Sequence, residues 1–271
     1  MSPLLTLEVH EGLQRALHAG DGAAPCSLDL GRTLTRVAVD AGGWECAGAR
    51  YPWFEGCRQR TIYHWTGSEF APLSRFGAAL IKLVPTQWGP PTFEIDGIKM
   101  LPTARVSPYE DARHKVDLVG VRGCQVLDTC GGLGYFAAWC LELGAASVLS
   151  CEKNPDVLWL RSLNPWSPAA AGRLTLLHVD VAAHIATLPD DSIDAILHDP
   201  PRFGIAGELY SRSFYAQLFR VLHRRGRLFH YTGTPNRLAR SRDLPREVMA
   251  RLQAVGFSAK PALDGVLASK L

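Results

Sequence analysis

Four carboxylates in the C-terminal part of the chain each follow a short apolar segment of the kind that forms a buried strand. They are Asp128, Glu152, Asp180 and Asp199. Parallel strands in an open α/β sheet point their carboxyl ends to one edge, where such sheets bind ligands. We therefore expect the four acids to point into a single crevice. Carboxylates there can accept hydrogen bonds from ribose hydroxyls, an adenine amino group or a cationic amine.

A glycine-bearing turn follows the first of these acids, with the pattern Asp128-x-Cys130-x-Gly132-x-Gly134 and a helical segment from Tyr135. Glycine has no Cβ and adopts positive φ at little cost, so a ligand can approach the backbone closely. The pattern differs from the spacing of dinucleotide sites, where the phosphates disfavour a carboxylate just before the glycines. A ligand with a cationic amino-acid end would suit it. The alternative is a turn whose glycines only permit close packing.

The order of the elements around this turn predicts an α/β sheet. Apolar segments typical of strands alternate with segments of helical periodicity. The predicted strands are 125–128, 147–151, 174–179, 193–198 and 227–231, and the predicted helices are 105–120, 135–143, 155–163, 209–222 and 245–255. Ser107 and Asn154 are good N-caps, each followed by a proline at the first helical position. The C-terminal segment predicts a hairpin that turns at Asp264.

Residues 1–103 differ from the rest and predict a small β-rich N-terminal domain, with residues 104–271 forming the α/β domain. Short alternating segments punctuated by Gly and Pro predict hairpins over 27–40 and 61–70 and strands over 79–84 and 92–100. Four aromatic residues of this domain could line a substrate groove and stack on bases, or they could fill the core of a small sheet. They are Trp53, Phe54, Tyr63 and Trp65. The core is the more common place for such rings.

The composition is that of a globular protein. Hydrophobic residues make up 47% and charged residues 20% of the chain. The net charge of +3 over 271 residues gives no strong electrostatic footprint for nucleic acid. No apolar run is long enough to cross a bilayer, so no membrane association is expected. Glu8 and Glu11 stand where a basic leader would be, which disfavours a secretory signal. We expect a cytoplasmic protein.

The seven cysteines are scattered and form no C-x-x-C pair. Cys124, Cys140 and Cys151 lie in apolar segments, where cysteine behaves as a small hydrophobe. This distribution fits a reducing compartment and no bound metal. Cys130 lies in the glycine turn, where a structural role is favoured over that of a covalent nucleophile.

The motif around Asp128 resembles the first motif of class I S-adenosylmethionine-dependent methyltransferases, and the chain from about residue 105 onward is similar to that class. The resemblance implies a Rossmann-like, mostly parallel sheet with an antiparallel edge strand. The C-terminal hairpin would supply that edge. The resemblance also implies S-adenosylmethionine as the cofactor.

The same resemblance assigns roles to the residues at the strand ends. Asp128, Gly132 and Gly134 would contact the methionine end of the cofactor. Glu152 would hold the ribose, and Asp180 the adenine. Further residues beside these positions are assigned to the same pocket, namely Cys130, Tyr135, Lys153, Val181 and Asp199.

Six segments also resemble, in the same order, an uncharacterised family of predicted methyltransferases found largely in archaea. They are PTFEIDGIKM, SPYEDARHKV, VLDTCGGLGY, LNPWSP, HDPPRFGIAGELYS and GRLFHYTGTP, and they span most of residues 80–256. The family has no known substrate, so the resemblance implies methyl transfer without identifying the acceptor. A small-molecule acceptor is expected ahead of RNA. The sequence is compatible with a homodimer as well as with a monomer.

Asp199-Pro200-Pro201 matches the fourth motif of the methyltransferase class. In amino-methylating enzymes an aromatic residue follows, and the acid of the motif is aimed at the substrate nitrogen. Here Arg202 occupies the aromatic position. It would bind an anionic group of the substrate in a bidentate manner, or brace the loop by pairing with Glu208.

Methyl transfer needs alignment of donor and nucleophile, and a base if the nucleophile loses a proton. Asp199 is predicted to orient the nucleophile. His198 is a candidate base, and a histidine simply packed at the strand end is equally open. Tyr210 and Tyr231 are candidates for the polar wall around the acceptor.

A second resemblance is to spermidine synthase, in SPYEDARHKV before the first strand of the α/β domain and in DPPRFGIAGELYSRSFYAQLFRVL after the fourth. It implies decarboxylated S-adenosylmethionine as the donor and a polyamine as the aminopropyl acceptor. Leu197 and His198 stand where that family would carry a further acid, and the glycine turn differs. Three functions stay open, namely a methyltransferase, an aminopropyltransferase, and a non-catalytic module that binds the cofactor.

Overall fold

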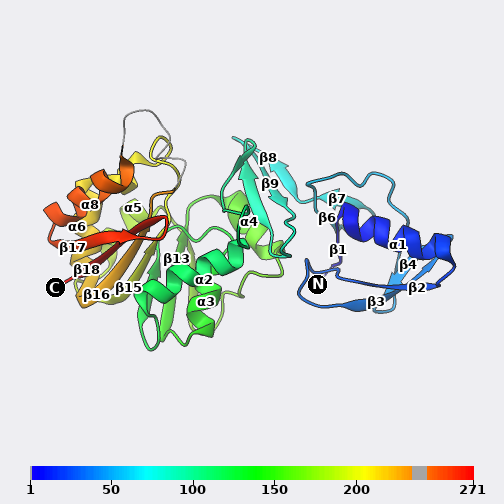
Figure 1. Cartoon of the computed structure of the whole chain (residues 1–271), viewed down its shortest axis with the longest axis horizontal. Coiled ribbons are helices and arrows are strands. Elements are labelled where there is room, and N and C mark those ends of the chain that lie inside the picture. Colours follow the sequence, from blue (N-terminus) through cyan, green and yellow to red (C-terminus); the bar gives the residue numbers. More distant parts are fainter. Residues whose placement is uncertain (1, 234–242) are drawn as a thin grey trace. The chain divides into compact units, whose positions relative to one another are not determined.

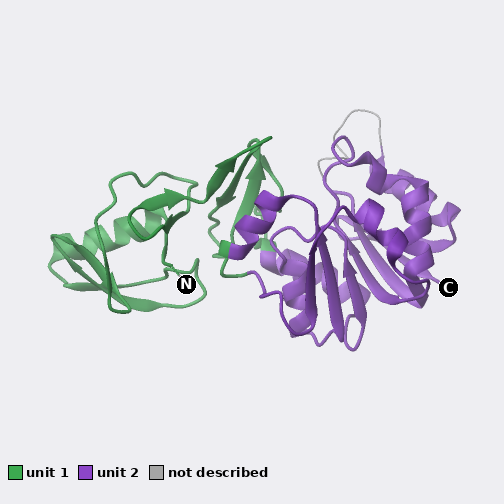
Figure 2. Cartoon of the chain, turned by 180° about the vertical axis from the view of Figure 1, so that it is seen from behind, with its two compact units in different colours: residues 1–108, 163–166 green, residues 109–162, 167–271 purple. Residues whose placement is uncertain are grey.

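The chain folds into two compact units, and the computed structural model describes residues 2–233 and 243–271. Unit 1 comprises residues 1–108 and 163–166, and unit 2 comprises residues 109–162 and 167–271 (Figure 2). Thr234 and Pro235, which end the last of the six similar segments, lie outside the described residues.

Unit 1 consists of a helix and small antiparallel sheets, whose strand orders are β1-β6-β7, β2-β3-β4-β5 and β11-β10-β9-β8. Its elements are β1 (Leu4–Leu5), α1 (Leu7–Ala19), β2 (Ala23–Cys26), β3 (Thr35–Asp40), β4 (Gly43–Cys46), β5 (Ala49–Tyr51), β6 (Tyr63–Trp65), β7 (Phe70–Pro72), β8 (Ser74–Phe76), β9 (Leu80–Val84), β10 (Thr92–Ile95) and β11 (Ile98–Lys99).

The helix α1 packs against β2 and β3 and closes the core of unit 1. Its N-cap Thr6 accepts a hydrogen bond from Val9 N, which satisfies one of the free amides of the first turn. Leu13 of the helix and Trp44 of β4 are fully buried in this core. A core of this kind depends on one apolar helix face, which here includes Leu13.

The aromatic residues of unit 1 pack on one another. Tyr63 is buried, and the Phe54 ring meets it edge-on with the centroids 4.8 Å apart. The Trp65 ring lies 5.1 Å from that of Phe70, and Trp53 packs against the same core. Of the two uses open from the sequence, these contacts fit core filling.

One predicted hairpin of unit 1 has a different shape. The hairpin predicted over 27–40 is formed by β2 and β3, whose paired residues begin at Ala23, while residues 27–34 form the connection. Asp29 accounts for the difference, because its Oδ1 accepts hydrogen bonds from Arg32 N at 3.1 Å and Thr33 N at 2.9 Å. These amides are therefore not free for a strand ladder.

Unit 2 is built on a seven-stranded sheet with the order β14-β13-β12-β15-β16-β18-β17. Neighbours from β14 to β16 are parallel, and β18 and β17 are antiparallel to their neighbours. The predicted α/β class, with its mostly parallel sheet and antiparallel edge, is confirmed. The strands are β12 (Gln125–Asp128), β13 (Ser147–Glu152), β14 (Leu174–His178), β15 (Ile193–His198), β16 (Leu222–Tyr231), β17 (Phe257–Ala262) and β18 (Gly265–Lys270).

Helices cover both faces of this sheet, with α2 and α3 on one side and α6 and α8 on the other (Figure 1). The helices are α2 (Pro108–Val119), α3 (Tyr135–Glu142), α4 (Pro155–Leu163), α5 (Val181–His184), α6 (Arg212–Val221) and α8 (Leu244–Ala254), with short 3-10 turns η1 (Ile185–Thr187) and η2 (Gly207–Tyr210).

The helix starts follow the capping residues of the sequence. Asn154 Oδ1 accepts a hydrogen bond from Asp156 N at 2.9 Å, so the predicted cap of α4 is confirmed. Helix α2 begins at Pro108, as its sequence predicted. The predicted helix over 209–222 is divided into η2 and α6, because Ser211 caps a new start by accepting from Phe214 N.

Within residues 2–233 and 243–271, no helix has the length and apolar character needed to cross a membrane. The same residues contain no group of three or more His, Cys, Asp or Glu side chains placed to hold a metal ion.

Candidate functional site

The four predicted acids lie at the carboxyl edge of the unit 2 sheet. Asp128 and Glu152 end β12 and β13, and Asp180 and Asp199 follow β14 and β15. Because these strands are parallel, the four positions share one edge. Their surroundings differ, since Asp128 is buried, Glu152 and Asp199 are partly buried and Asp180 is exposed. Each acid therefore has its own possible chemistry.

Glu152 joins the end of β13 to the glycine turn. Its Oε2 accepts a hydrogen bond from Gly132 N at 3.0 Å, and its Oε1 accepts one from Asn154 N at 2.8 Å. Burial raises the pKa of Glu152, and the two backbone amides act in the opposite direction. Each carboxylate oxygen has a second lone pair, so the group can also accept from a ligand hydroxyl.

Asp128 lies beneath the turn with no exposed surface. Its Oδ2 accepts a hydrogen bond from Ser150 Oγ at 2.8 Å, and Arg161 Nη1 donates to the same Ser150 oxygen at 3.1 Å. Desolvation raises the pKa of Asp128 to about 6, against the opposing charge of Arg161. Asp128 Oδ1 has no hydrogen-bond partner among the described residues.

Arg161 explains two of the glycines in the turn. A Cβ on Gly134 would lie 2.6 Å from Arg161 Cζ, and a Cβ on Gly131 would lie 2.4 Å from Ser150 Oγ and 2.8 Å from Arg161 Nη1. At these two positions the missing side chain makes room for the buried arginine, so close packing applies there. Gly132 differs, because its N–H holds Glu152.

Two further residues assigned to the cofactor pocket have side chains committed to the protein. Cys130 is partly buried, and burial together with the charge of Glu152 raises the pKa of its thiol well above the ordinary value. The thiol is therefore protonated, which argues against a nucleophile. Tyr135 is 4% exposed, and its ring packs against that of Tyr109 at 5.4 Å.

At the outer part of the edge, Lys153 joins two acids. Its Nζ lies 3.6 Å from Asp180 Oδ2 and 3.7 Å from Glu208 Oε1. Asp180 also caps α5, because its Oδ1 accepts from Ala182 N at 2.9 Å. Val181 is buried in the core of unit 2, so only its main chain is left for a ligand.

A buried lysine gathers three acids near the end of β15. Lys115 of α2 is 1% exposed, and its Nζ lies 2.6 Å from Asp111 Oδ2 and 3.8 Å from Asp264 Oδ2. Burial lowers the pKa of Lys115, but the charges of Asp199, Asp111 and Asp264 raise it above the ordinary value. We call Lys115, Asp111, Asp199 and Asp264 the lysine–acid cluster. Three carboxylates around one ammonium leave the cluster with an excess of negative charge.

Asp199 has the most strongly perturbed carboxyl of the predicted acids. Its pKa is raised to about 7, chiefly by desolvation and also by the charges of Asp111 and Asp264, against the opposing charge of Lys115. A carboxyl with this pKa exchanges its proton near neutral pH, which suits a group that takes a proton from a substrate. Tyr231 adjoins the cluster, with its ring centroid 4.1 Å from Lys115 Nζ. Burial raises the pKa of Tyr231, so its hydroxyl stays protonated.

His198 does not have the surroundings of a base. It is fully buried, its Nε2 lies 3.1 Å from Leu209 O, and its Nδ1 lies 2.7 Å from Thr129 Oγ1. A carbonyl only accepts, so Nε2 carries the proton and Nδ1 accepts from the Thr129 hydroxyl. Burial lowers the pKa of His198 to about 4. Its role as a base is therefore corrected to that of a packed histidine, which stacks edge-on against His230 at 4.4 Å.

The loop after β15 is closed by its own contacts. Tyr210 OH donates to Pro201 O at 3.0 Å, and Ile205 N donates to Arg202 O at 2.7 Å. Glu208 pairs with Lys153, which is the partner the structure gives it in place of Arg202. The Arg202 side chain is exposed, and its charge acts on Tyr231.

Lys115, Asp264 and Arg161 were missed by sequence reasoning. Asp111 and Lys115 stand four residues apart on a predicted helix, a spacing that indicates an ion pair but not its burial. Asp264 was read only as a turn residue. Nothing in the sequence around Arg161 distinguishes it from an arginine on the outer face of α4.

No family model matches the chain. An uncharacterised protein of Methanocaldococcus jannaschii is 48% identical over 178 residues, which are 65% of this chain and 61% of that protein. The match thus spans about six tenths of the relative's length.

Two spermidine synthases are similar to the chain in structure. One, bound to the transition-state analogue AdoDATO, has a TM-score of 0.58 at 16% identity and covers 75% of this chain and 77% of its own. The other, from Thermotoga maritima, has a TM-score of 0.56 at 15% identity and covers 78% and 79%. At such identity the likeness shows the fold alone. Together with the strand order, it shows a Rossmann-like α/β fold of the kind found in spermidine synthases.

Proposed function

We propose that the chain is a transferase that binds S-adenosylmethionine and transfers its methyl group to an amino nitrogen of a small-molecule acceptor. The observation that carries the proposal is the bond between Glu152 and Gly132 N. It holds a carboxylate with free lone pairs at the end of β13, beside a turn where Gly132 presents no side chain. A nucleoside needs that combination, because the carboxylate accepts from the ribose hydroxyls while the turn passes close to the ligand.

The other residues of the edge extend this assignment. Asp180, which is exposed at the end of β14, would accept a hydrogen bond from the adenine amino group. Asp128 is fully buried, so in this proposal it acts on the cationic methionine end through its charge and not by direct contact. Gly134 and Val181 contribute main-chain groups only. The donor supplies a methyl carbon already activated by a positively charged sulfur.

The lysine–acid cluster supports an amine as the acceptor. Asp199 accepts a hydrogen bond from the amino group and so directs the nitrogen lone pair toward the donor. With the donor bound, the methyl group would pass from its sulfur to this nitrogen, and Asp199 would take the proton that the nitrogen then loses. Its raised pKa of about 7 matches this task near neutral pH. Tyr231 provides a neutral hydroxyl beside the same acid.

The alternative is an aminopropyltransferase that uses decarboxylated S-adenosylmethionine. The excess of carboxylates over Lys115 favours a polycationic acceptor, and the likeness to spermidine synthases is in keeping with it. The glycine turn, which differs from that of the spermidine synthase family, weighs toward methyl transfer.

A transfer assay with two donors separates these functions. The full chain is incubated with methyl-labelled S-adenosylmethionine, or with decarboxylated donor labelled in the aminopropyl group, and with the small-molecule fraction of a cell extract or a linear diamine. We expect methyl label in an amine product, and loss of that product in Asp199→Asn with donor affinity retained. Aminopropyl label in the diamine would establish the alternative. Transfer of neither label at saturating donor would contradict both.

A further inference from the structure

The parallel pair β15–β16 contains a long bulge at its amino end. Leu222 pairs with Ile193 and Arg227 pairs with Ala195, so residues 223–226 of β16 stand opposite Asp194 alone. Their sequence is His-Arg-Arg-Gly, and Arg227 follows. The side chains of His223, Arg224, Arg225 and Arg227 are all exposed. We call these four residues the basic bulge.

The backbone of the bulge is specified by the sequence. A Cβ on Gly226 would lie 2.8 Å from Asp194 O and 2.7 Å from Leu222 Cδ1, so only glycine fits without a shift. Arg225 has a φ of 68°, a conformation that few residues other than glycine adopt. Bulges re-aim the side chains of a strand. In this bulge consecutive basic side chains face solvent, whereas in a regular strand they would alternate between the two faces of the sheet.

The basic bulge borders a hollow of about 370 Å³ within unit 2, which Gly120 and Cys124 also line. Asp194 is the acid that lines it, and Asp194 Oδ2 accepts from Gln125 N at 2.8 Å. Among the described residues that line the hollow there is no Phe, Tyr or Trp. The hollow thus offers positive charge without a surface for stacking a base.

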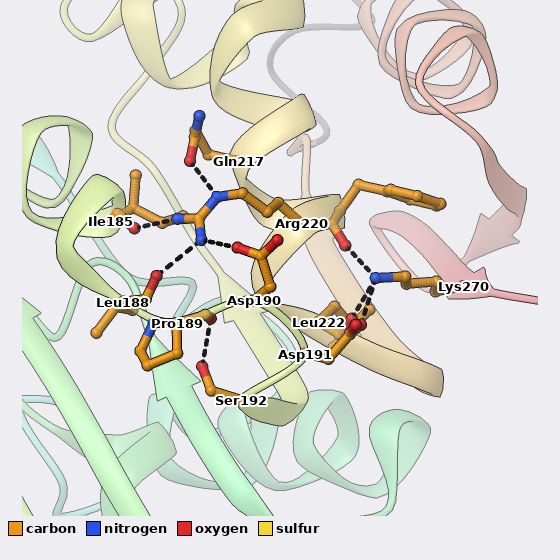
Figure 3. A network of polar contacts seen from close by, with 11 residues as sticks. Ile185, Leu188, Pro189, Asp190, Asp191, Ser192, Gln217, Arg220, Leu222 and Lys270 are labelled. Carbon is orange, nitrogen blue, oxygen red and sulfur yellow. Dashed lines mark hydrogen bonds and ion pairs between the residues drawn. The ribbon is translucent and has the colours of Figure 1, made fainter.

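Two other acids close in sequence to Asp194 are already paired. Figure 3 shows Asp190 with Arg220, at 2.5 Å from Oδ1 to Nη1, and Asp191 with Lys270, at 2.6 Å from Oδ1 to Nζ. In the described part of the chain, no carboxylate forms an ion pair with the bulge arginines Arg224, Arg225 and Arg227. Their charge is therefore available to a ligand.

We propose that the basic bulge binds the sugar–phosphate backbone of a single-stranded nucleic acid. Guanidinium groups bind phosphate in a planar, bidentate manner, and three of them close together can follow successive phosphates. A membrane surface is disfavoured, because stable attachment through so few cations also needs apolar side chains beside them. Contacts of this kind are made to phosphates and not to base edges, so the binding is independent of sequence.

The basic bulge is distinct from the candidate donor site. It lies at the amino ends of the parallel strands, whereas Glu152 and Asp199 lie at their carboxyl ends. The six residues of β15 separate the two edges by about 20 Å. Binding there does not require the donor, so the inference goes beyond the proposed function and stands or fails independently of it.

The test is fluorescence anisotropy with a labelled single-stranded RNA of mixed sequence and the full chain, over a series of salt concentrations. The variant Arg224→Gln/Arg227→Gln removes two cations of the bulge, and Arg36→Gln/Arg246→Gln removes two exposed cations elsewhere. We expect the double bulge variant to reduce the slope of log affinity against log salt by about 1.4, since each phosphate contact on a single strand contributes roughly 0.7. The control variant should retain the slope of the natural sequence.

Several results would overturn the proposal. They are no RNA binding by the natural sequence at 50 mM salt, equal slopes for the bulge variant and the control, or displacement of the RNA by inorganic triphosphate at an equal concentration of phosphate groups. The last result would mean a site for small anions. Unchanged melting temperatures and donor affinities in both variants would show that the fold and the donor site are intact.

Discussion

Burial determines what the carboxyl of Asp128 contributes to the protein. Its native pKa of about 6 lies above the ordinary value of 3.8, so the folded chain binds this proton more tightly than the unfolded chain does. The contribution of the group to stability is therefore largest below about pH 4 and falls as the pH rises to about 6. Most acids in ion pairs show the opposite sign, because pairing lowers their pKa.

The variant Asp128→Asn has no such proton to lose. We expect its free energy of unfolding, relative to that of the natural sequence, to rise between pH 4.5 and pH 7, by at most about 3 kcal/mol from a shift of roughly two pKa units. Urea denaturation at the two pH values measures the difference. A difference that stays constant, or falls, would show that burial does not raise the pKa of Asp128.

Glu152 offers a direct test of the donor site. We expect Glu152→Ala to raise the Kd for S-adenosylmethionine by about 10- to 150-fold, the effect of losing hydrogen bonds to a charged group. Glu142→Ala, at the exposed end of α3, is the matched control and should leave the Kd unchanged. Equal affinities of the two variants would remove Glu152 from the ribose role.

The sequence predicted which acids stand at the carboxyl edge, but not their individual environments. The position of Glu152 after an apolar strand was enough to place it. The burial of His198 and the lysine–acid cluster were not predictable, because α2, β15 and the β17–β18 turn meet only in the folded chain. Periodicity shows which residues end a strand, whereas a pKa depends on every group that packs around them.

At the scale of the elements, the turn between β12 and α3 is shaped as much by Arg161 as by any ligand. The guanidinium of α4 lies against Gly131 and Gly134, which have no side chains to exclude it. The turn, the end of β13 and α4 therefore pack together beneath the candidate donor site.

This packing predicts the effect of a single methyl group. We expect Gly131→Ala to lower the free energy of unfolding by about 1–3 kcal/mol, the usual cost of overpacking, because its Cβ would meet Ser150 Oγ and Arg161 Nη1. Gly204→Ala is the control, since a Cβ there meets no atom within 4 Å. Chemical denaturation of both variants measures the difference. Equal stabilities would mean that the turn moves away from Arg161 freely.

The strands and helices of unit 2 were largely predictable, because apolar strands, capped helices and the C-terminal hairpin all agreed with one sheet. The connection after β2 was not. Asp29 there satisfies backbone amides with its side chain, a local competition that an alternating pattern does not reveal. The bulge in β16 was also hidden, since the predicted strand began only at 227.

At the scale of the whole molecule, the net charge of +3 conceals an uneven distribution. The carboxyl edge of the unit 2 sheet carries the acids, while the amino edge carries the basic bulge. The composition alone therefore disfavoured a nucleic-acid ligand, and only the register of β15 against β16 shows where cations are displayed. The assignment of residues 163–166 to unit 1 was not predictable from the sequence either. It depends on contacts such as the hydrogen bond from Trp166 Nε1 to Leu30 O.

The central claim is that the carboxyl edge of the unit 2 sheet binds an adenosine-bearing sulfonium. Isothermal titration of the full chain with S-adenosylmethionine, its decarboxylated form and S-adenosylhomocysteine measures this directly. We predict saturable one-to-one binding of S-adenosylmethionine, with the decarboxylated donor binding more weakly. If none of the three compounds binds, the account is contradicted and both proposed enzymatic functions are excluded.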